Sequence, residues 1–159
     1  MATTGQAASE QSRQGELTGV QEQRAQLRAA LLGVEAVVSS ALTGRTAQWA
    51  AEIAPPMLRL RDSVDRHVAV TEGAGGLFEQ IQTDSPRLSG AVQRLHVEHE
   101  QFQAEIAGVL AKLSASPADP VEMAALREQI NTLIGRIVRH RQRGADLIND
   151  AYEVDIGGG

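Results

Sequence analysis

Apolar residues recur at spacings of three, four or seven along four long segments of the chain, and this pattern indicates the fold class. Such spacing places the apolar side chains on one face of an α-helix, whereas a half-buried strand alternates apolar and polar residues. The clearest apolar stripe lies in the third segment and comprises Leu88, Val92, Leu95, His99, Phe102, Ile106, Leu110 and Leu113. Strand-like alternation and internal repeats are both absent from the sequence, so the pattern predicts an all-α fold.

Turn and capping residues divide this pattern into four predicted helices, at residues 16–42, 45–82, 86–115 and 120–152. Pro55-Pro56 predicts a kink or a restart within the second helix, because proline lacks the backbone N–H that the helix interior requires. Ser85-Pro86 and Asp119-Pro120 each place a capping residue before a proline at the first helical position, which is typical of a helix start.

Short connections between four amphipathic helices favour an up-down-up-down four-helix bundle. Residues 1–15 are polar, small and aperiodic, and they predict a disordered N-terminal tail. The predicted bundle domain spans 16–156, and the glycines of 157–159 predict a flexible C-terminal end.

Charge and composition exclude several classes of function. The net charge of −5 argues against nucleic acid as a partner, since phosphate binding requires a basic surface. The chain has no cysteine, which excludes disulfides, thiolate metal sites and cysteine nucleophiles. No apolar run reaches the roughly 18 residues of a membrane span, and the N-terminus lacks the apolar stretch of a signal peptide. We therefore expect no membrane span and a cytoplasmic location.

Three of the four histidines lie on apolar stripes, each on a different predicted helix: His67, His99 and His140. With a rise of about 1.5 Å per residue, their positions relative to the helix ends predict that they meet in one layer of the bundle. His96 lies one residue off the stripe of the third helix. Several buried imidazoles are costly unless they share a partner. The predicted layer is therefore either a metal site or a hydrogen-bonded network with carboxylates.

The segments around these histidines carry a likeness to a known family. They read HVAVTEGAGGLFEQI at 67–81, RLHVEHEQF at 94–102 and HRQRGADLINDAYEVDIGG at 140–158. With these segments the chain resembles the hemerythrin-like (HHE) family over most of residues 16–156. That family is a four-helix bundle in which inward histidines and two carboxylates hold a pair of irons. The resemblance implies a non-haem iron protein that handles or senses O₂, peroxide, NO or iron.

The family motif places one histidine on the first helix, H-x3-E on the second, H-x3-H on the third and H-x4-D on the fourth. Three of its histidines match this chain, whereas Gln23 and Gln103 stand at the other two histidine positions. The two carboxylates, Glu72 and Asp146, each come one residue later than in the family. A one-residue bulge in each helix would turn them inward, whereas in straight helices they point to solvent.

The metal ligands implied by the resemblance are His67, Glu72, His99, His140 and Asp146. Since glutamine is a poorer iron ligand than histidine, this reduced set suits a single iron or zinc ion better than a pair of irons. A small diatomic ligand or peroxide would then bind at the positions that Gln23 and Gln103 leave open. The alternative is a metal-free helical bundle that serves as an interaction module or accessory subunit of a larger complex.

Overall fold

The computed structural model of the protein describes residues 3–115 and 119–152, and within these ranges every regular element is helical. The elements are α1 (Thr3–Val38), α2 (Thr46–Glu72), α3 (Leu77–Asp84), the 3₁₀ turn η1 (Pro86–Leu88), α4 (Ser89–Ala115) and α5 (Pro120–Tyr152). The prediction of an all-α fold with four long helices is confirmed, and α5 has the predicted bounds.

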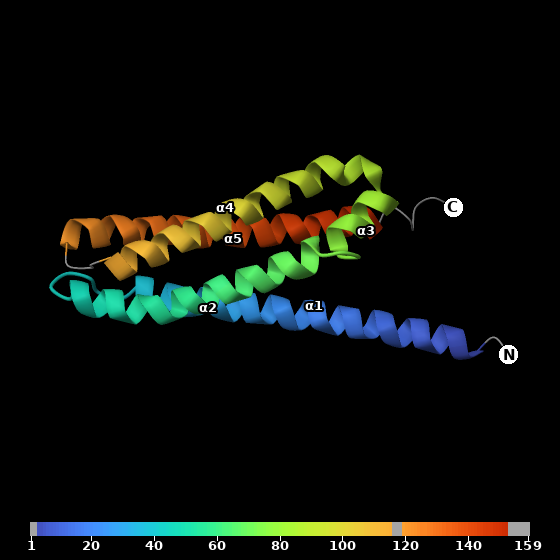
Figure 1. Ribbon diagram of the computed structural model, residues 1–159, viewed down its shortest axis with the longest axis horizontal. Helices are drawn as coiled ribbons and strands as arrows, with labels where there is room; N and C mark the ends of the chain where they lie inside the picture. Colours follow the sequence, from blue (N-terminus) through green and yellow to red (C-terminus); the bar gives the residue numbers. More distant parts are fainter. Residues whose placement is uncertain (1–2, 116–118, 153–159) are drawn as a thin grey trace.

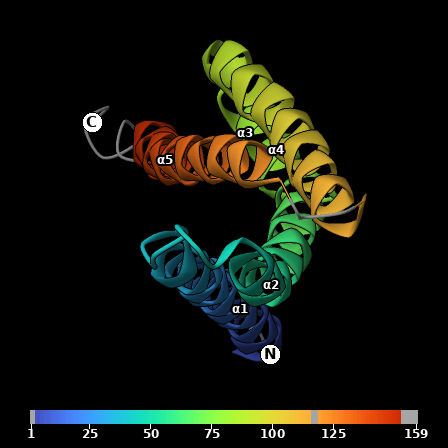
Figure 2. The same ribbon diagram turned by 90° about the vertical axis from the view of Figure 1, so that its left-hand side faces the viewer.

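The four long helices form two antiparallel pairs (Figure 1). Helices α1 and α2 pack on each other along one side, and α4 and α5 lie together on the other side (Figure 2). Successive long helices run in opposite directions, and the short helix α3 lies between α2 and α4 at one end of the molecule. Each of the four long helices therefore packs one face against the opposite pair.

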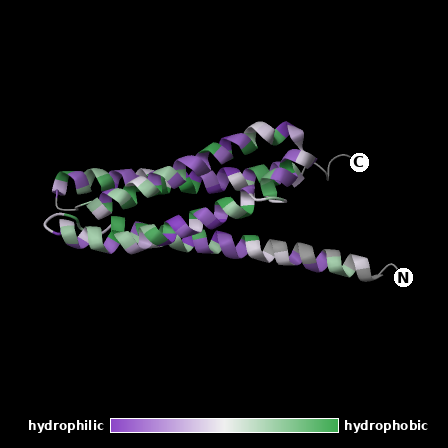
Figure 3. Cartoon of the chain, in the orientation of Figure 1, coloured by the Kyte–Doolittle hydropathy of each residue, from purple (hydrophilic) through white to green (hydrophobic). Residues whose placement is uncertain are grey.

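The core consists of two apolar clusters separated along the helix axes. The larger cluster joins α1, α2, α4 and α5 and contains Trp49, whose indole Nε1 donates a hydrogen bond of 3.1 Å to the Val37 carbonyl oxygen. The smaller cluster comprises Phe78, Ile81, Leu88, Val92, Leu95 and Leu147. Hydrophobic and hydrophilic residues are mixed along each long helix, as amphipathic packing requires (Figure 3). None of the described helices combines the length and the apolar composition needed to cross a membrane.

Helix α1 corrects the prediction for the N-terminus. The segment 1–15 was predicted to be disordered, but the helix already begins at Thr3, and its first turns project beyond the other helices (Figure 1). The segment contains three alanines and three glutamines, which favour helix. Extending an existing helix costs far less free energy than nucleating a new one. The predicted domain end at residue 156 and the predicted flexible end 157–159 lie outside the described residues.

The second predicted helix is interrupted at a different place from the one expected. Helix α2 continues through Pro55 and Pro56, so the predicted restart there is wrong. Pro56 is buried against α1, where a Cβ added to Gly33 would lie 3.9 Å from the Cβ of Pro56. This close packing of the two helices offsets the backbone hydrogen bond that the proline cannot make.

The interruption occurs instead at residues 73–76, three of which are glycines, between α2 and α3. Gly75 has a φ of 70°, a left-handed conformation that glycine adopts without steric cost. A Cβ on Gly76 would lie 2.7–2.9 Å from three backbone carbonyl oxygens, so only glycine fits this turn. The turn places α3 against α4 and α5, and it brings the Phe78 ring next to the ring of His99 on α4.

Candidate metal centre

Three histidines from three helices meet between the two apolar clusters. The Nε2 atoms of His99 (α4) and His140 (α5) are 2.9 Å apart, and the Nε2 atoms of His140 and His67 (α2) are 3.4 Å apart. One ring nitrogen from each of the three lies within 4.8 Å of the others, so the triad could hold a metal ion. His99 and His140 are buried and His67 is half-buried. The predicted convergence of these histidines in one layer is confirmed.

Two phenylalanines fix the orientation of the His99 and His140 rings. The Phe78 ring lies parallel to the His99 ring, with centroids 5.5 Å apart and an interplanar angle of 5°. The Phe102 ring meets the His140 ring edge-on at 5.2 Å. Rings packed in this way lose little further conformational entropy when they bind a ligand, so the triad is preorganised.

Each buried histidine has a carboxylate behind it. His99 donates its Nδ1–H to Glu72 (2.5 Å) and His140 donates its Nδ1–H to Glu98 (2.6 Å). A neutral imidazole carries only one proton, so both Nε2 atoms then direct lone pairs towards each other. Because the two Nε2 atoms are only 2.9 Å apart, their lone pairs repel each other unless a proton or a cation lies between them. The arrangement of carboxylate, histidine and converging Nε2 is the one that metal-binding histidines usually have.

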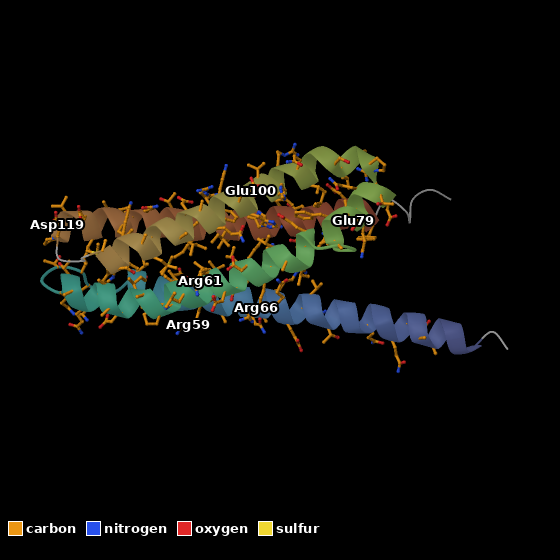
Figure 4. All side chains as sticks on the ribbon, in the orientation of Figure 1. Arg59, Arg61, Arg66, Glu79, Glu100 and Asp119 are labelled. Carbon is orange, nitrogen blue, oxygen red and sulfur yellow. The ribbon has the colours of Figure 1, made fainter. Side chains whose placement is uncertain are left out.

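The two carboxylates are held in place by further polar contacts. Glu98 also accepts a hydrogen bond from Arg143, and His96 Nδ1 lies 2.9 Å from the Oε1 atom of Glu72. His96 itself lies towards the outer face of α4, with Glu100 3.6 Å from its Nε2; Glu100 is labelled in Figure 4. His96 therefore supports a carboxylate of the site without belonging to the triad.

The two carboxylates expected as direct ligands have different places in the structure. Glu72 is the last residue of α2 and reaches Nδ1 of His99 from the helix end, without a bulge. Asp146 is exposed and accepts a hydrogen bond from Gln142 at 3.0 Å, so it does not join the triad. Helix α5 remains regular between His140 and Asp146, and six residues turn a side chain by about 240°.

Glu98 is the residue that sequence reasoning missed. It directly precedes His99 on α4, yet its partner is His140 on the neighbouring helix α5. A carboxylate beside the apolar stripe, at the boundary between α4 and α5, was the only signal in the sequence. Its partner follows from the way in which the two helices are rotated against each other.

The two glutamines expected to face the histidine layer behave differently. Gln23 of α1 is buried and lines a cavity of about 310 Å³ next to His67 and His140. Gln103 instead donates a hydrogen bond of 3.0 Å to Asp65 of α2, at the surface of the molecule. The expectation that both glutamines face the histidine layer is therefore confirmed for Gln23. It is wrong for Gln103, which is hydrogen-bonded to a carboxylate of the adjacent helix α2.

Burial keeps the three imidazoles neutral. Burial, together with the neighbouring His99 and His140, lowers the pKa of His67 from 6.5 to about 3. Burial also lowers the pKa values of His99 and His140, and it outweighs the opposing effect of Glu72 on the first and of Glu98 on the second. At neutral pH all three side chains are therefore in the uncharged form that binds metal ions.

These lowered pKa values predict that acid destabilises the metal-free protein. Below pH 6.5 the unfolded chain takes up protons that the folded His67 does not bind until about pH 3. The free energy of unfolding should therefore fall as the pH decreases through this window, by up to about 1.4 kcal/mol per pH unit for one such group. Urea midpoints of chelator-treated protein at pH 7.5 and pH 5 measure the effect. His67→Gln should reduce the difference, and equal midpoints in the original protein would contradict the prediction.

Comparison of the chain with protein-family models, curated proteins and solved structures gives no match. A helical fold alone supports many functions, so function has to be inferred from the chemistry of the triad.

Proposed function

We propose that this protein binds one divalent transition-metal ion through the Nε2 atoms of His67, His99 and His140. In this proposal the site is a mononuclear version of the hemerythrin-like iron site. A small ligand, such as O₂, peroxide or NO, binds at a coordination position that the three histidines leave open. The observation that carries the proposal is the convergence of Nε2 atoms whose opposite ring nitrogens donate to carboxylates.

The donor set fits an ion of this kind. Metal–nitrogen bonds of 2.0–2.1 Å in a tetrahedral site separate the ligand nitrogens by about 3.3 Å. The Nε2 separations of 2.9 Å (His99–His140) and 3.4 Å (His140–His67) lie on either side of this value, and the ring nitrogens of His67 and His99 lie within 4.8 Å of each other. Neutral imidazoles suit iron, zinc, copper and nickel, whereas magnesium and calcium prefer oxygen ligands. Among these, iron is the ion that the family resemblance implies, and zinc is an ion that three histidines commonly bind.

The charge of the site favours a single divalent ion. Glu72 and Glu98 contribute two negative charges, of which Arg143 offsets part, and the remainder partly balances the charge of one such ion from behind the histidine rings. The family's paired irons use two further histidines, whereas Gln23 and Gln103 occupy those positions here. An ion bound by three histidines supplies a Lewis acid with an open position. The chain's own residues hold the three rings, balance the charge and shield the site with Phe78 and Phe102.

Metal analysis of the purified protein tests the proposal. Protein purified without chelator, or supplied with zinc or with iron(II) under anaerobic conditions, should retain about one ion per chain after desalting. Gln103→Ala is the matched control, because Gln103 of α4 contacts Asp65 at the surface rather than the triad, and this variant should retain the metal. Less than about a tenth of an ion per chain under all these conditions would favour the alternative, a metal-free interaction module.

A further inference from the structure

The cavity beside the triad has the size and walls of a small-molecule site. Its volume of about 310 Å³ lies at the lower end of the range for such sites. All five α-helices contribute to its walls, α4 through Leu95 alone. Most of the lining side chains are apolar, among them Val20, Leu27, Val70, Leu77, Phe78 and Leu95. His67 and His140 form part of the lining, so the cavity leads directly to the triad. A molecule with a hydrocarbon body would fit these walls.

The cavity also contains a buried donor that has no acceptor. The side-chain amide nitrogen of Gln23 is buried and has no hydrogen-bond partner in the described part of the chain. Gln23 as a whole is only 8% exposed. The hydroxyl of Thr71, which also lines the cavity, already donates to the His67 carbonyl oxygen at 2.8 Å. A buried donor without a partner costs folding free energy, which an acceptor oxygen on a bound molecule would recover.

Two arginines of the cavity add positive charge. Arg24 of α1 and Arg141 of α5 line the cavity, and Arg28 lies close enough to act on the Arg141 guanidinium. Neither Arg24 nor Arg141 forms an ion pair with an acid whose side chain the structure describes. Several guanidinium groups gathered without a carboxylate attract an anion, and arginine binds carboxylates with particular specificity.

We infer that this cavity binds a small organic acid, with its hydrocarbon body against Leu77, Phe78 and Leu95 and its carboxylate held by Gln23, Arg24 and Arg141. The cavity supplies an apolar surface, a hydrogen-bond donor and positive charge, and these are the three features that such an acid requires. The inference rests on the proposed function in that the acid would lie beside the open position of the metal ion. The inference assigns a class of ligand to the cavity, for which the metal proposal names none.

Calorimetric titration with hexanoate, hexan-1-ol and inorganic phosphate tests the inference on the zinc-loaded and the chelator-treated protein. Hexanoate should bind, and hexan-1-ol should bind at least about tenfold more weakly because it lacks the charge. Arg141→Gln should weaken hexanoate binding by a similar factor, and Gln23→Leu should also weaken it. Arg139→Gln is the matched control, because Arg139 is an exposed arginine of α5 outside the cavity, and it should leave the affinity unchanged.

Three results would overturn the inference. They are no binding of hexanoate at millimolar concentration to either form, equal binding of hexanoate and hexan-1-ol, and displacement of hexanoate by phosphate at similar concentration. Hexanoate binding that depends on Arg141 in a protein that takes up no metal would support the cavity assignment while refuting the metal proposal. Circular dichroism of each variant separates a loss of affinity from a loss of folding.

Discussion

Replacing His140 with alanine is expected to lower the bound metal from about one ion per chain to less than about a tenth. His140 is the central member of the triad, because its Nε2 lies 2.9 Å from that of His99 and 3.4 Å from that of His67. Without it only two imidazoles remain, and Glu98 loses the histidine to which it is hydrogen-bonded. Two neutral ligands hold a divalent ion far less tightly than three. Elemental analysis of the desalted protein measures the loss.

The same variant should remain folded. The substitution removes a buried side chain and leaves a small cavity, but it also relieves the repulsion between facing lone pairs. We expect the metal-free variant to be destabilised by no more than about 3 kcal/mol, which urea unfolding would measure. His96→Ala, which leaves the triad intact, serves as the control for the general effect of losing an imidazole. Full retention of metal by His140→Ala would show that the ion binds elsewhere.

The carboxylates behind the rings should have the second-largest effect. Glu72→Gln and Glu98→Gln keep the size of each side chain but remove its negative charge, so each should lower the metal affinity by about 10- to 100-fold. The loss arises because an amide accepts the Nδ1–H less strongly and no longer balances the charge of the ion. Competition with a chelator of known affinity measures the change.

Asp146→Asn is the matched control for these two variants. It removes the same charge from the carboxylate that the family resemblance assigned to the site, but Asp146 is exposed and pairs with Gln142. Its effect on metal affinity should be less than about twofold, as for other exposed charges. A loss as large as that of Glu98→Gln would show that α5 rearranges on metal binding and that Asp146 becomes a ligand.

The helices and the histidine layer were predictable from the sequence because both depend on the regular geometry of the α-helix. A period of 3.6 residues assigns each residue to a face, and a constant rise assigns it a height. The stripe from Val92 to Leu113 therefore defined the inner face of α4. The heights of His67, His99 and His140 were sufficient to predict that they meet. Neither step requires knowledge of how the helices pack.

The polar partners were decided only by the tertiary structure. Glu98 lies beside the inner stripe of α4. It is hydrogen-bonded to His140 because the rotation of α4 and α5 about their axes brings these two side chains together. Gln103 turns to Asp65 rather than to the triad, and Asp146 remains at the surface. The turn at Gly75 and Gly76 directs Phe78 onto His99, although the sequence predicted one continuous helix there. Such contacts depend on the rotation and crossing angle of neighbouring helices, which many residues determine jointly through side-chain packing and no local pattern specifies.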